Sequence, residues 1–394
     1  MKAIYISGCI PYNGKSGGRL ASYNHLLKIS QEYEEVYAFF VDVEYDSHEF
    51  VQNSIPQNVK VKIFKRNIPP AKTLFTSIIA ILRNIFSKFP RSMDVVYSDA
   101  IVSDIENIYK LNKNIIVILD HFDAFSNLYD LNYLKILYIA HNNESNFHYQ
   151  KMFFDKKINF FFNLLNFIKT KYFEKILLEK SKKNIFISSS DYNHFIQFKD
   201  KSTVYPEFIK LKQDIWCLEK TNSRSILFLG SSSHYPNKEA TLWLIKFFAP
   251  ILLKMDSSIV INICGLSEES LNIDKDYPKN LNFLGRVDDE TLTKCFLSNR
   301  VFLSPIVLGS GIKIKILEAA SYCLPIFSTP ESIIGLEHFD EIIKTSQRTD
   351  AEKFVKDFLN FFNDDFLLCS QSEKLFKMNT MLQNNKENYF TYDD

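Results

Sequence analysis

The hydrophobic residues of this chain fall into short continuous runs, several of which are followed by apolar positions at helical spacing. The runs Ala3–Ser7 and Ser225–Gly230 each lead into a polar or glycine-containing loop and then into a helical pattern, over Arg19–Ile29 and Glu239–Phe248. A strand, a loop and a helix in this order form the opening unit of a Rossmann-like domain. The pattern therefore predicts two such domains.

Further apolar runs predict parallel strands, because a strand covered on both faces is continuously hydrophobic. In the first half they are Val36–Phe40, Val59–Phe64, Val95–Tyr97, Ile115–Leu119, Leu137–Ala140 and Asn184–Ile187; in the second half they are Val260–Cys264, Leu281–Leu284, Val301–Leu303, Leu324–Phe327 and Glu341–Lys344. Residues 199–222 lack clear periodicity, and 206–222 is the predicted linker. The expected fold is α/β with two doubly wound sheets, comprising an N-terminal domain at 1–205, a C-terminal domain at 223–365 and a helical tail at 366–394.

The composition narrows the classes of protein. Of the 394 residues, 46% are hydrophobic and 24% are charged, which is ordinary for a globular protein. Lys and Arg number 47 against 46 Asp and Glu, so the net charge of +1 provides no basic excess for binding nucleic acid. The six cysteines have neither CxxC nor Cys/His spacing, which predicts no structural zinc and no disulfide framework and indicates a reducing compartment.

The chain opens without a secretory signal pattern, and no run reaches the roughly 18 apolar residues that span a bilayer. We therefore expect a cytoplasmic protein. Segments 74–89 and 151–183 are rich in aromatic residues, and lysines outnumber acids in the second. Such segments either lie on an anionic membrane, here the cytoplasmic face of the inner membrane, or form core helices with a solvated basic face, and both readings stay open.

Ligands of open α/β sheets bind beyond the carboxyl ends of the strands, so the loops there are the candidate sites. In the first half, Gly14, Gly17, Gly18 and Arg19 precede or begin a helix, and glycines let a backbone approach a phosphate that the helix N-terminus attracts. The loop is neither GxGxxG nor a P-loop, which disfavours NAD and ATP. A tight strand-to-helix turn without a ligand is the alternative.

A second candidate follows the predicted strand Leu137–Ala140. His141 and Glu144 lie there, where an imidazole and a carboxylate can bond sugar hydroxyls or transfer protons. A rival is the segment Asp120–Asp123, which contains His121 and follows another predicted strand. A purely structural histidine is the alternative reading of either.

The loop and helix at 308–320 form the third candidate. A GSG loop leads into a helix there, so backbone N–H groups and lysines favour a diphosphate, and Glu318 lies near the distance from a diphosphate to a ribose. An amphipathic helix with solvated lysines is the alternative, although a glutamate in a mostly apolar stretch is costly to bury without a partner. The candidate residues are Gly309, Ser310, Gly311, Ile312, Lys313, Lys315 and Glu318.

Acidic pairs occur at Asp42/Glu44 and Asp288/Asp289, but neither accompanies a nucleotide-binding loop, and we interpret both as surface acids. No metal or other cofactor is therefore expected. A leaving diphosphate then needs lysines and helix ends for its stabilisation, and the third candidate supplies both.

The stretch Ile226–Leu336 resembles the carboxyl-terminal domain of group 1 retaining glycosyltransferases with the GT-B fold. The resemblance runs through LFLGSSSHYPNKEATLWLIKFFAPIL, INICG, LNFLGRVDDETLTKCF, VFLSPIVLGSGIKIKILEAASYCLPIFST and IIGLE, and GSGIKIKILEAAS is its most specific piece. The first half matches more loosely, through SGGRLASYNHLL, AHNNES and EKILLEKSKKNIFISSSD. The resemblance implies two Rossmann-like domains that face a central cleft.

The resemblance also implies roles for individual residues. Gly17 and Gly18 would approach the donor diphosphate, and His141 would contact the donor sugar near the reacting carbon. Glu318 matches the second glutamate of the family's paired-Glu signature, which binds the nucleotide ribose. The other donor-binding candidates are Arg19, Asn237, Gly309, Gly311, Ile312 and Lys315, with Arg286 and Val287 in the loop that usually holds the base.

Two departures from the family pattern affect the site. The first glutamate of the signature would fall at Ser310, which makes Ser310 a catalytic candidate beside His141 and Lys313. The family's usual Arg and Lys fall near Ser231 and Asn237, so charge for the phosphates would come from Lys313 or Lys315.

Together these features lead us to expect a metal-independent glycosyltransferase that moves a sugar, with retention, from a UDP- or GDP-sugar to a bacterial surface glycan or glycolipid. A catalytically weak partner subunit, which Ser310 favours, and a nucleotide-sugar epimerase of the same fold stay open as alternatives. The sugar, the acceptor site and the oligomeric state are not assigned.

Overall fold

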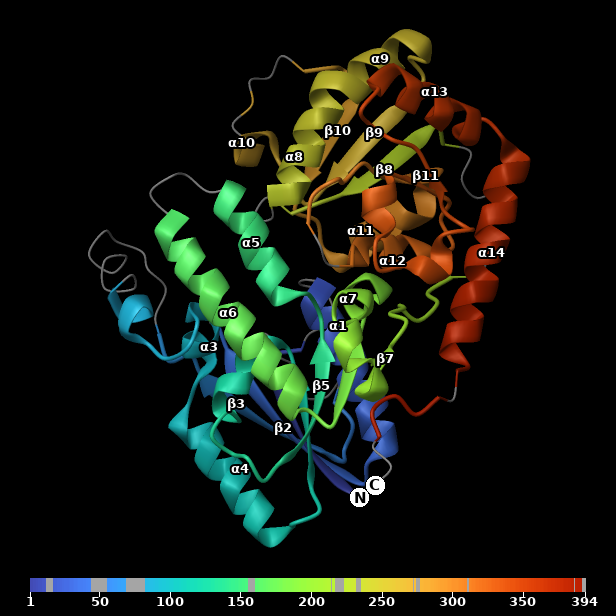
Figure 1. Cartoon of the computed structure of the whole chain (residues 1–394). Helices are drawn as coiled ribbons and strands as arrows, with labels where there is room; N and C mark the ends of the chain where they lie inside the picture. The colour runs from blue at the N-terminus through green and yellow to red at the C-terminus, as the bar shows by residue number, and fades with distance from the viewer. Residues whose placement is uncertain are drawn as a thin grey trace. The chain divides into compact units, whose positions relative to one another are not determined.

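The computed structural model describes residues 1–11, 17–43, 55–68, 82–154, 160–213, 215–216, 223–231, 235–271, 273, 277–309, 312–385 and 387–391. The chain divides into two compact units. The first comprises Met1–Tyr205 with Glu387–Asp394, and the second comprises Pro206–Lys386. Each is built around one parallel sheet with helices on its faces (Figure 1).

The first unit contains a seven-stranded parallel sheet. Its strands are, in spatial order, β3 (Val59–Lys65), β2 (Glu35–Asp42), β1 (Lys2–Ser7), β4 (Ile116–Asp120), β5 (Lys135–Ala140), β6 (Lys183–Phe186) and β7 (Ser202–Val204). All five residues of β4 are buried, as the continuous apolar run predicts.

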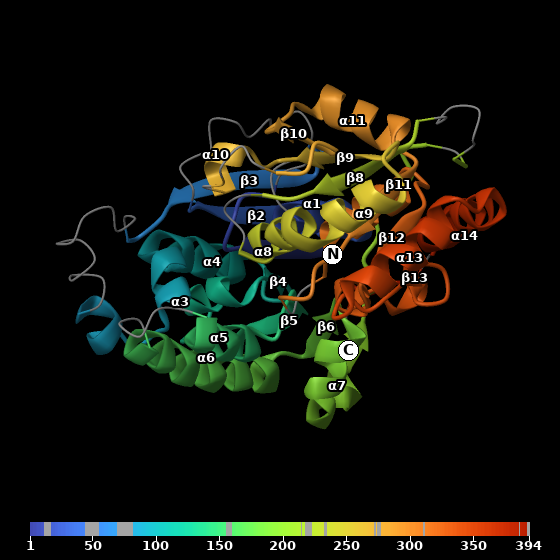
Figure 2. The ribbon, with the colours of Figure 1, turned by 90° about the horizontal axis from the view of Figure 1, so that it is seen from above.

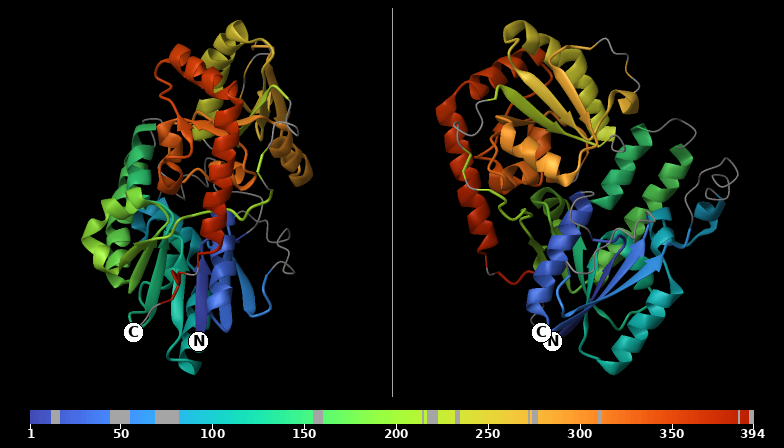
Figure 3. Two further views of the ribbon diagram at one scale, coloured as in Figure 1. Left: turned by 90° about the vertical axis from the view of Figure 1, so that its right-hand side faces the viewer. Right: turned by 180° about the vertical axis from the view of Figure 1, so that it is seen from behind.

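Helices cover both faces of this sheet, with α1 on one face and α6 on the other (Figures 1 and 3). The α-helices are α1 (Gly17–Glu32), α3 (Arg91–Val96), α4 (Asp99–Leu111), α5 (Glu144–Phe154), α6 (Phe160–Lys180) and α7 (Ser189–His194), and the 3₁₀ turns are η3 (Phe122–Asn127) and η5 (Ile196–Lys201). This alternation is a doubly wound arrangement.

The second unit repeats the plan with six parallel strands, of which Figure 2 shows β10, β9 and β8 side by side. In spatial order the strands are β10 (Leu281–Gly285), β9 (Val260–Cys264), β8 (Ser225–Leu229), β11 (Val301–Ser304), β12 (Ile326–Ser328) and β13 (Lys344–Thr345). The helices are α8 (Tyr235–Trp243), η7 (Leu244–Phe248), α9 (Ala249–Met255), α10 (Glu268–Leu271), α11 (Asp289–Ser298), α12 (Ile314–Ser321), η8 (Pro330–Ile333), η9 (Glu337–Phe339), α13 (Ala351–Phe362) and α14 (Asp365–Gln383).

Three sequence predictions of elements are wrong in detail. Val95–Tyr97 is not a strand, because Pro90 starts helix α3 and its buried Met93, Val95 and Val96 pack into the core as helical residues. Strand β7 lies where no periodicity was found, and the predicted strand Glu341–Lys344 overlaps β13 at Lys344 alone. Both strands are very short, which leaves little pattern to read.

The C-terminal region also differs from the expected tail. Helix α14 spans 19 residues of the second unit, with Asp364 accepting a hydrogen bond from the Leu367 N–H at 3.0 Å and Leu368, Leu375 and Leu382 buried. The following residues, 387–391, belong to the first unit, where Phe390 is fully buried. Among the described residues, no helix combines the length and the hydrophobicity needed to cross a bilayer.

Candidate functional site

The strand order of the first sheet reverses between β1 and β4, which is the point where doubly wound folds bind their ligands. The two strands end in register, with Ser7 opposite Asp120. The sequence candidates of this unit therefore meet at one edge of the sheet.

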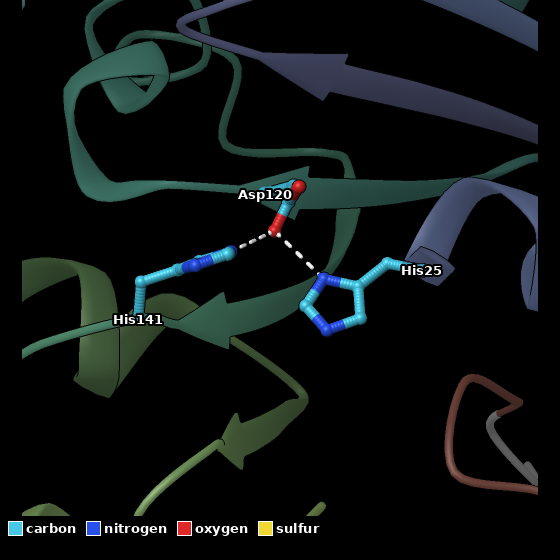
Figure 4. A group of neighbouring side chains, drawn as sticks. All are labelled: His25, Asp120 and His141. Carbon is cyan, nitrogen blue, oxygen red and sulfur yellow. Dashed lines mark hydrogen bonds and ion pairs between the residues drawn. The ribbon is translucent and has the colours of Figure 1, made fainter. Parts of the chain in front are cut away.

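Asp120 is the centre of a buried cluster at this edge (Figure 4). Its Oδ1 accepts a hydrogen bond from Nε2 of His141 at 2.5 Å and faces Nδ1 of His25 at 3.3 Å. The Tyr5 hydroxyl donates to the other carboxylate oxygen. His25 comes from α1, Asp120 ends β4 and His141 follows β5, so three segments far apart in the sequence share one carboxylate.

The electrostatics of the cluster keep Asp120 ionised. Burial by itself would raise the pKa of Asp120, but the two imidazoles attract and hydrogen-bond its carboxylate and hold the pKa well below its usual range. Burial and the neighbouring His141 lower the pKa of His121 to about 3, so this histidine is neutral at physiological pH.

His121 covers the ring of His141. The two rings are stacked with centroids 3.7 Å apart and planes at 16°, and Ser22 Oγ lies 2.9 Å from His121 Nε2. The backbone of His121 has φ +76°, a left-handed conformation that costs a non-glycine residue about 1 kcal/mol or more. The structure therefore brings together His141 and its sequence rival Asp120–Asp123.

The glycine-containing loop of the first unit reaches the same place. Gly17 begins α1, and a Cβ built on Gly18 would lie 3.7 Å from His121 Cε1. Arg19 is buried. Gly14 lies outside the described residues, so the contacts of this loop are known only from Gly18 onward.

Two further carboxyl groups lie next to the cluster in the sequence. Asp123 faces Gly8 so closely that a Cβ on Gly8 would be 2.2 Å from Asp123 Oδ1, and burial raises the pKa of Asp123 to about 6. Burial and the nearby Glu174 raise the pKa of Glu144 to about 8.

Glu174 of α6 holds the loop that carries His141. Its carboxylate accepts hydrogen bonds from the backbone N–H groups of Glu144 and Ser145, at 2.7 and 3.2 Å, at the start of α5. Burial raises the pKa of Glu174 to about 7. The first turn of α5 is thus tied to α6 directly after the candidate histidine.

In the second unit, the loop after β11 lies against the start of α8. Gly309 has φ +91°, and a Cβ there would lie 3.6 Å from Pro236 Cγ. Lys313 donates from Nζ to the Gly309 carbonyl at 2.7 Å. Asn237 is buried and donates to the Ser231 carbonyl at 3.4 Å, so two of the predicted donor-binding segments are neighbours.

The base of the loop after β11 is fixed by hydroxyl groups. Ser332 Oγ accepts from the Ile306 N–H at 3.2 Å and donates to the Ser304 carbonyl at 2.8 Å, and Thr329 Oγ1 donates to the Ile306 carbonyl at 2.5 Å. The segment then continues into α12, on which Glu318 is partly exposed between buried neighbours. Ile312 and Lys315 are also partly exposed, whereas Ser310 and Gly311 lie outside the described residues.

Arg286 and Val287 are not grouped with that loop. They follow β10 at the edge of the sheet, with β9 and β8 between them and β11. Arg286 is exposed, and Asp288 caps α11 by accepting from the Thr291 N–H at 2.7 Å.

The interpretation of Asp42 as a surface acid is wrong, because its side chain is buried at the end of β2.

The cluster around Asp120 also has the composition of a metal site. Ligand atoms of His25, Asp120 and His141 all lie within 4.8 Å of one another, and among the described residues this is the group that could hold an ion. The hydrogen bond between His141 and Asp120 uses two of these atoms directly with each other.

Sequence reasoning missed His25, Tyr5 and Ser22. Ser22 and His25 are three residues apart in the apolar segment LASYNHLL, so a helical wheel places both on one face of α1. Nothing in the sequence says that this face meets the end of β4.

Comparisons with known proteins agree with this architecture. Residues 223–364 match the family model described as glycosyl transferases group 1. A protein of Klebsiella pneumoniae, described as an uncharacterized 44.6 kDa protein in the cps region, is 23% identical over 380 residues, which cover 91% of this chain and 90% of that protein.

Two solved structures illustrate the similarity of the whole fold. TarM of S. aureus has a TM-score of 0.65 at 13% identity, over 96% of this chain and 95% of its own. HepE of Anabaena, solved in complex with UDP and glucose, has a TM-score of 0.62 at 11% identity, over 97% of this chain and 95% of its own. This protein therefore has the GT-B fold, and its residues 223–364 match the family model of group 1 glycosyl transferases.

Proposed function

We propose that this protein transfers a sugar from a UDP- or GDP-sugar to a glycan or glycolipid acceptor of the bacterial surface. The observation that carries the proposal is the match of residues 223–364 to the family model of group 1 glycosyl transferases, a region in which an anchored loop leads into α12 and Glu318. HepE, which has the same fold, was solved with UDP and glucose. The relative from Klebsiella pneumoniae lies in a cps region, which supports a surface polysaccharide as the product.

The second unit supplies the proposed donor site. Backbone N–H groups at the start of α12, with Lys313 and Lys315, stabilise the diphosphate, because a helix N-terminus and cations both favour negative charge. Glu318 accepts from the ribose hydroxyls, and the loop with Arg286 and Val287 holds the base. In this proposal the N–H groups and the two lysines stabilise the leaving diphosphate without a metal.

The first unit supplies the proposed reaction side. His141, held by Asp120 and covered by His121, contacts the donor sugar near its anomeric carbon. The bond from that carbon to the diphosphate breaks, and a bond to the acceptor oxygen forms on the same face, so the configuration is retained. The acceptor proton passes to the leaving phosphate oxygen.

A thermal-shift panel tests the donor site. UDP, GDP, ADP and CMP are added with Mg²⁺ or EDTA to the wild type, to Glu318→Ala and to Glu352→Ala, an exposed control on α13. A ligand at a hundredfold excess over its Kd stabilises by about 2.7 kcal/mol. We expect one nucleoside diphosphate to shift the wild type and the control equally, with or without metal, and to shift Glu318→Ala less.

The same thermal-shift panel distinguishes the proposed transferase from the alternative of a partner subunit. If no nucleotide shifts the melting temperature, the proposed donor site is wrong, and a catalytically weak partner subunit, which Ser310 favours, becomes the better interpretation. If a nucleotide binds, the anomeric coupling constant in the ¹H NMR spectrum of the product tests retention. An inverted product would contradict the mechanism.

We further propose that the first unit docks peripherally on the inner membrane. Lys169 of α6 donates from Nζ to the carbonyls of Asn84 and Ser87, at 2.5 and 2.6 Å, so the described parts of both aromatic segments lie side by side. Phe86 and Phe161 are 84% and 79% exposed there. Cosedimentation with phosphatidylglycerol vesicles that is lost in a Phe86→Ser/Phe161→Ser variant would support this, and unchanged binding would refute the surface.

A further inference from the structure

Tyr389 and Phe390, close to the end of the described chain, are buried in the first unit. The Tyr33 hydroxyl donates to the Phe390 carbonyl at 2.8 Å, and Lys183 Nζ donates to the Thr391 carbonyl at 3.1 Å. The Phe390 ring is fully buried, with its centroid 5.1 Å from that of Tyr205. Tyr389 and Phe390 are therefore packed into this unit, whereas Glu387 and Asn388 are exposed.

The ring of Phe390 also packs against His25, with centroids 5.7 Å apart. His25 is fully buried, and its ring also makes an edge-to-face contact with Tyr205, with centroids 5.5 Å apart. The rings of Phe390, Tyr205 and His141 thus border the imidazole of His25, and the centroids of the two imidazoles are 5.3 Å apart. Contacts therefore run from Phe390 through His25 to His141 by two routes, through the shared Asp120 carboxylate and through the direct contact of the two imidazole rings.

The geometry at Asp120 makes these contacts a positioning device. One carboxylate oxygen serves both imidazoles, so its place depends on His25 as well as on His141. Because a carboxylate only accepts, Nε2 of His141 carries the hydrogen of this bond, so the position of the Asp120 oxygen fixes the orientation of the ring. A displaced carboxylate would turn the ring or change its tautomer.

We propose that His25 and Phe390 are positioning residues that orient His141, both through Asp120 and through the contact of the His25 ring with the His141 ring, so that the C-terminal segment 387–391 completes the reaction side of the site. The inference rests on the proposed contact of His141 with the donor sugar. It assigns a role to a segment that follows the second unit in the chain. This segment lies more than 350 residues from His25 in the sequence, yet the two are in contact in the structure.

Kinetics of single and double variants test the proposal. Phe390→Leu and His25→Phe are measured alone and combined with His141→Ala, with Ile105→Ala as a control that removes buried volume from α4 in the same unit. Small misplacements of a catalytic group can cost up to about a hundredfold in rate. We expect each of the two variants to lower kcat at least about tenfold, with the donor KM changed less than about twofold.

The double variants identify the route of the effect. In the His141→Ala background, Phe390→Leu and His25→Phe should lower kcat no further, because residues that act through one group are not additive. The proposal would be overturned if these substitutions lowered kcat by the same factor with and without His141. It would also be overturned if Ile105→Ala lowered kcat as much as Phe390→Leu. A wild-type kcat in both single variants would overturn it as well.

A second measurement does not depend on the sugar-transfer activity. The chain has eight histidines, so ¹⁵N spectra of the imidazoles can resolve the tautomer of His141 in the intact protein. We expect Phe390→Leu to move the His141 signals and Ile105→Ala to leave them in place. Unmoved signals in Phe390→Leu refute the positioning role, whereas a wild type without transferase activity refutes the proposed function instead.

Discussion

The buried carboxyl group of Glu174 should make the stability of the first unit depend on pH. Its side chain is 3% exposed, and burial raises its pKa from the ordinary 4.5 to about 7. The folded state therefore holds a proton that the unfolded state releases between about pH 4.5 and 7, so the free energy of unfolding falls as the pH rises through this range. At about 1.4 kcal/mol for each pH unit, the loss reaches about 3 kcal/mol.

Replacement of Glu174 by glutamine should remove this loss. The amide oxygen can still accept from the Glu144 N–H, which lies 2.7 Å from the carboxylate, but it cannot ionise. We therefore expect Glu174→Gln to gain about 3 kcal/mol over the wild type between pH 4.5 and 7, and to keep that gain above pH 7. Glu144→Gln is the matched variant, and because the pKa of Glu144 is about 8, its gain should continue to about pH 8.

Urea unfolding followed by far-UV circular dichroism measures the difference at each pH. Both tryptophans, Trp216 and Trp243, lie in the second unit, so their fluorescence reports that unit separately and should not respond to Glu174→Gln. A constant difference between variant and wild type from pH 5 to 7.5 would mean that Glu174 is ionised throughout. The reasoning from burial would then be wrong.

Three further substitutions test the packing inside each unit, two in the second unit and one in the first. Gly265→Ala should cost the second unit at least about 2 kcal/mol, because the backbone has φ +85° and a Cβ would lie 1.9 Å from the Gly230 carbonyl oxygen; an unchanged urea midpoint of tryptophan fluorescence would contradict this. Phe354→Ala should lower the same midpoint by the equivalent of about 3–5 kcal/mol, since the ring is fully buried against Phe327, Phe248 and Trp243. Gly8→Ala should destabilise the first unit, because the new methyl group would displace the Asp123 carboxylate; circular dichroism that matches the wild type in urea would refute that contact.

Local pattern determined most of the architecture. The continuous apolar runs at 36–40 and 301–303 are strands with mostly buried residues, because a strand covered on both faces leaves a mark that does not depend on its neighbours. The predicted strand at 59–64 is also a strand, but its lysines alternate with apolar residues and are exposed, so it is covered mainly on one face. The same rule fails for Val95–Tyr97, where three apolar residues fit a buried helix end equally well. Short elements such as β7 and β13 leave too few residues for any period to show.

The sequence by itself also pointed to His141 and to the rival segment Asp120–Asp123, because both follow strands whose carboxyl ends form the ligand edge. Only the tertiary structure showed that they are one cluster, since the order β1–β4–β5 puts the ends of β4 and β5 side by side. It alone added His25 and Phe390, which reach the cluster from α1 and from the far end of the chain. A pattern of hydrophobicity records which face of an element is buried but not which element covers it, and the identity of that partner decides the chemistry of this site.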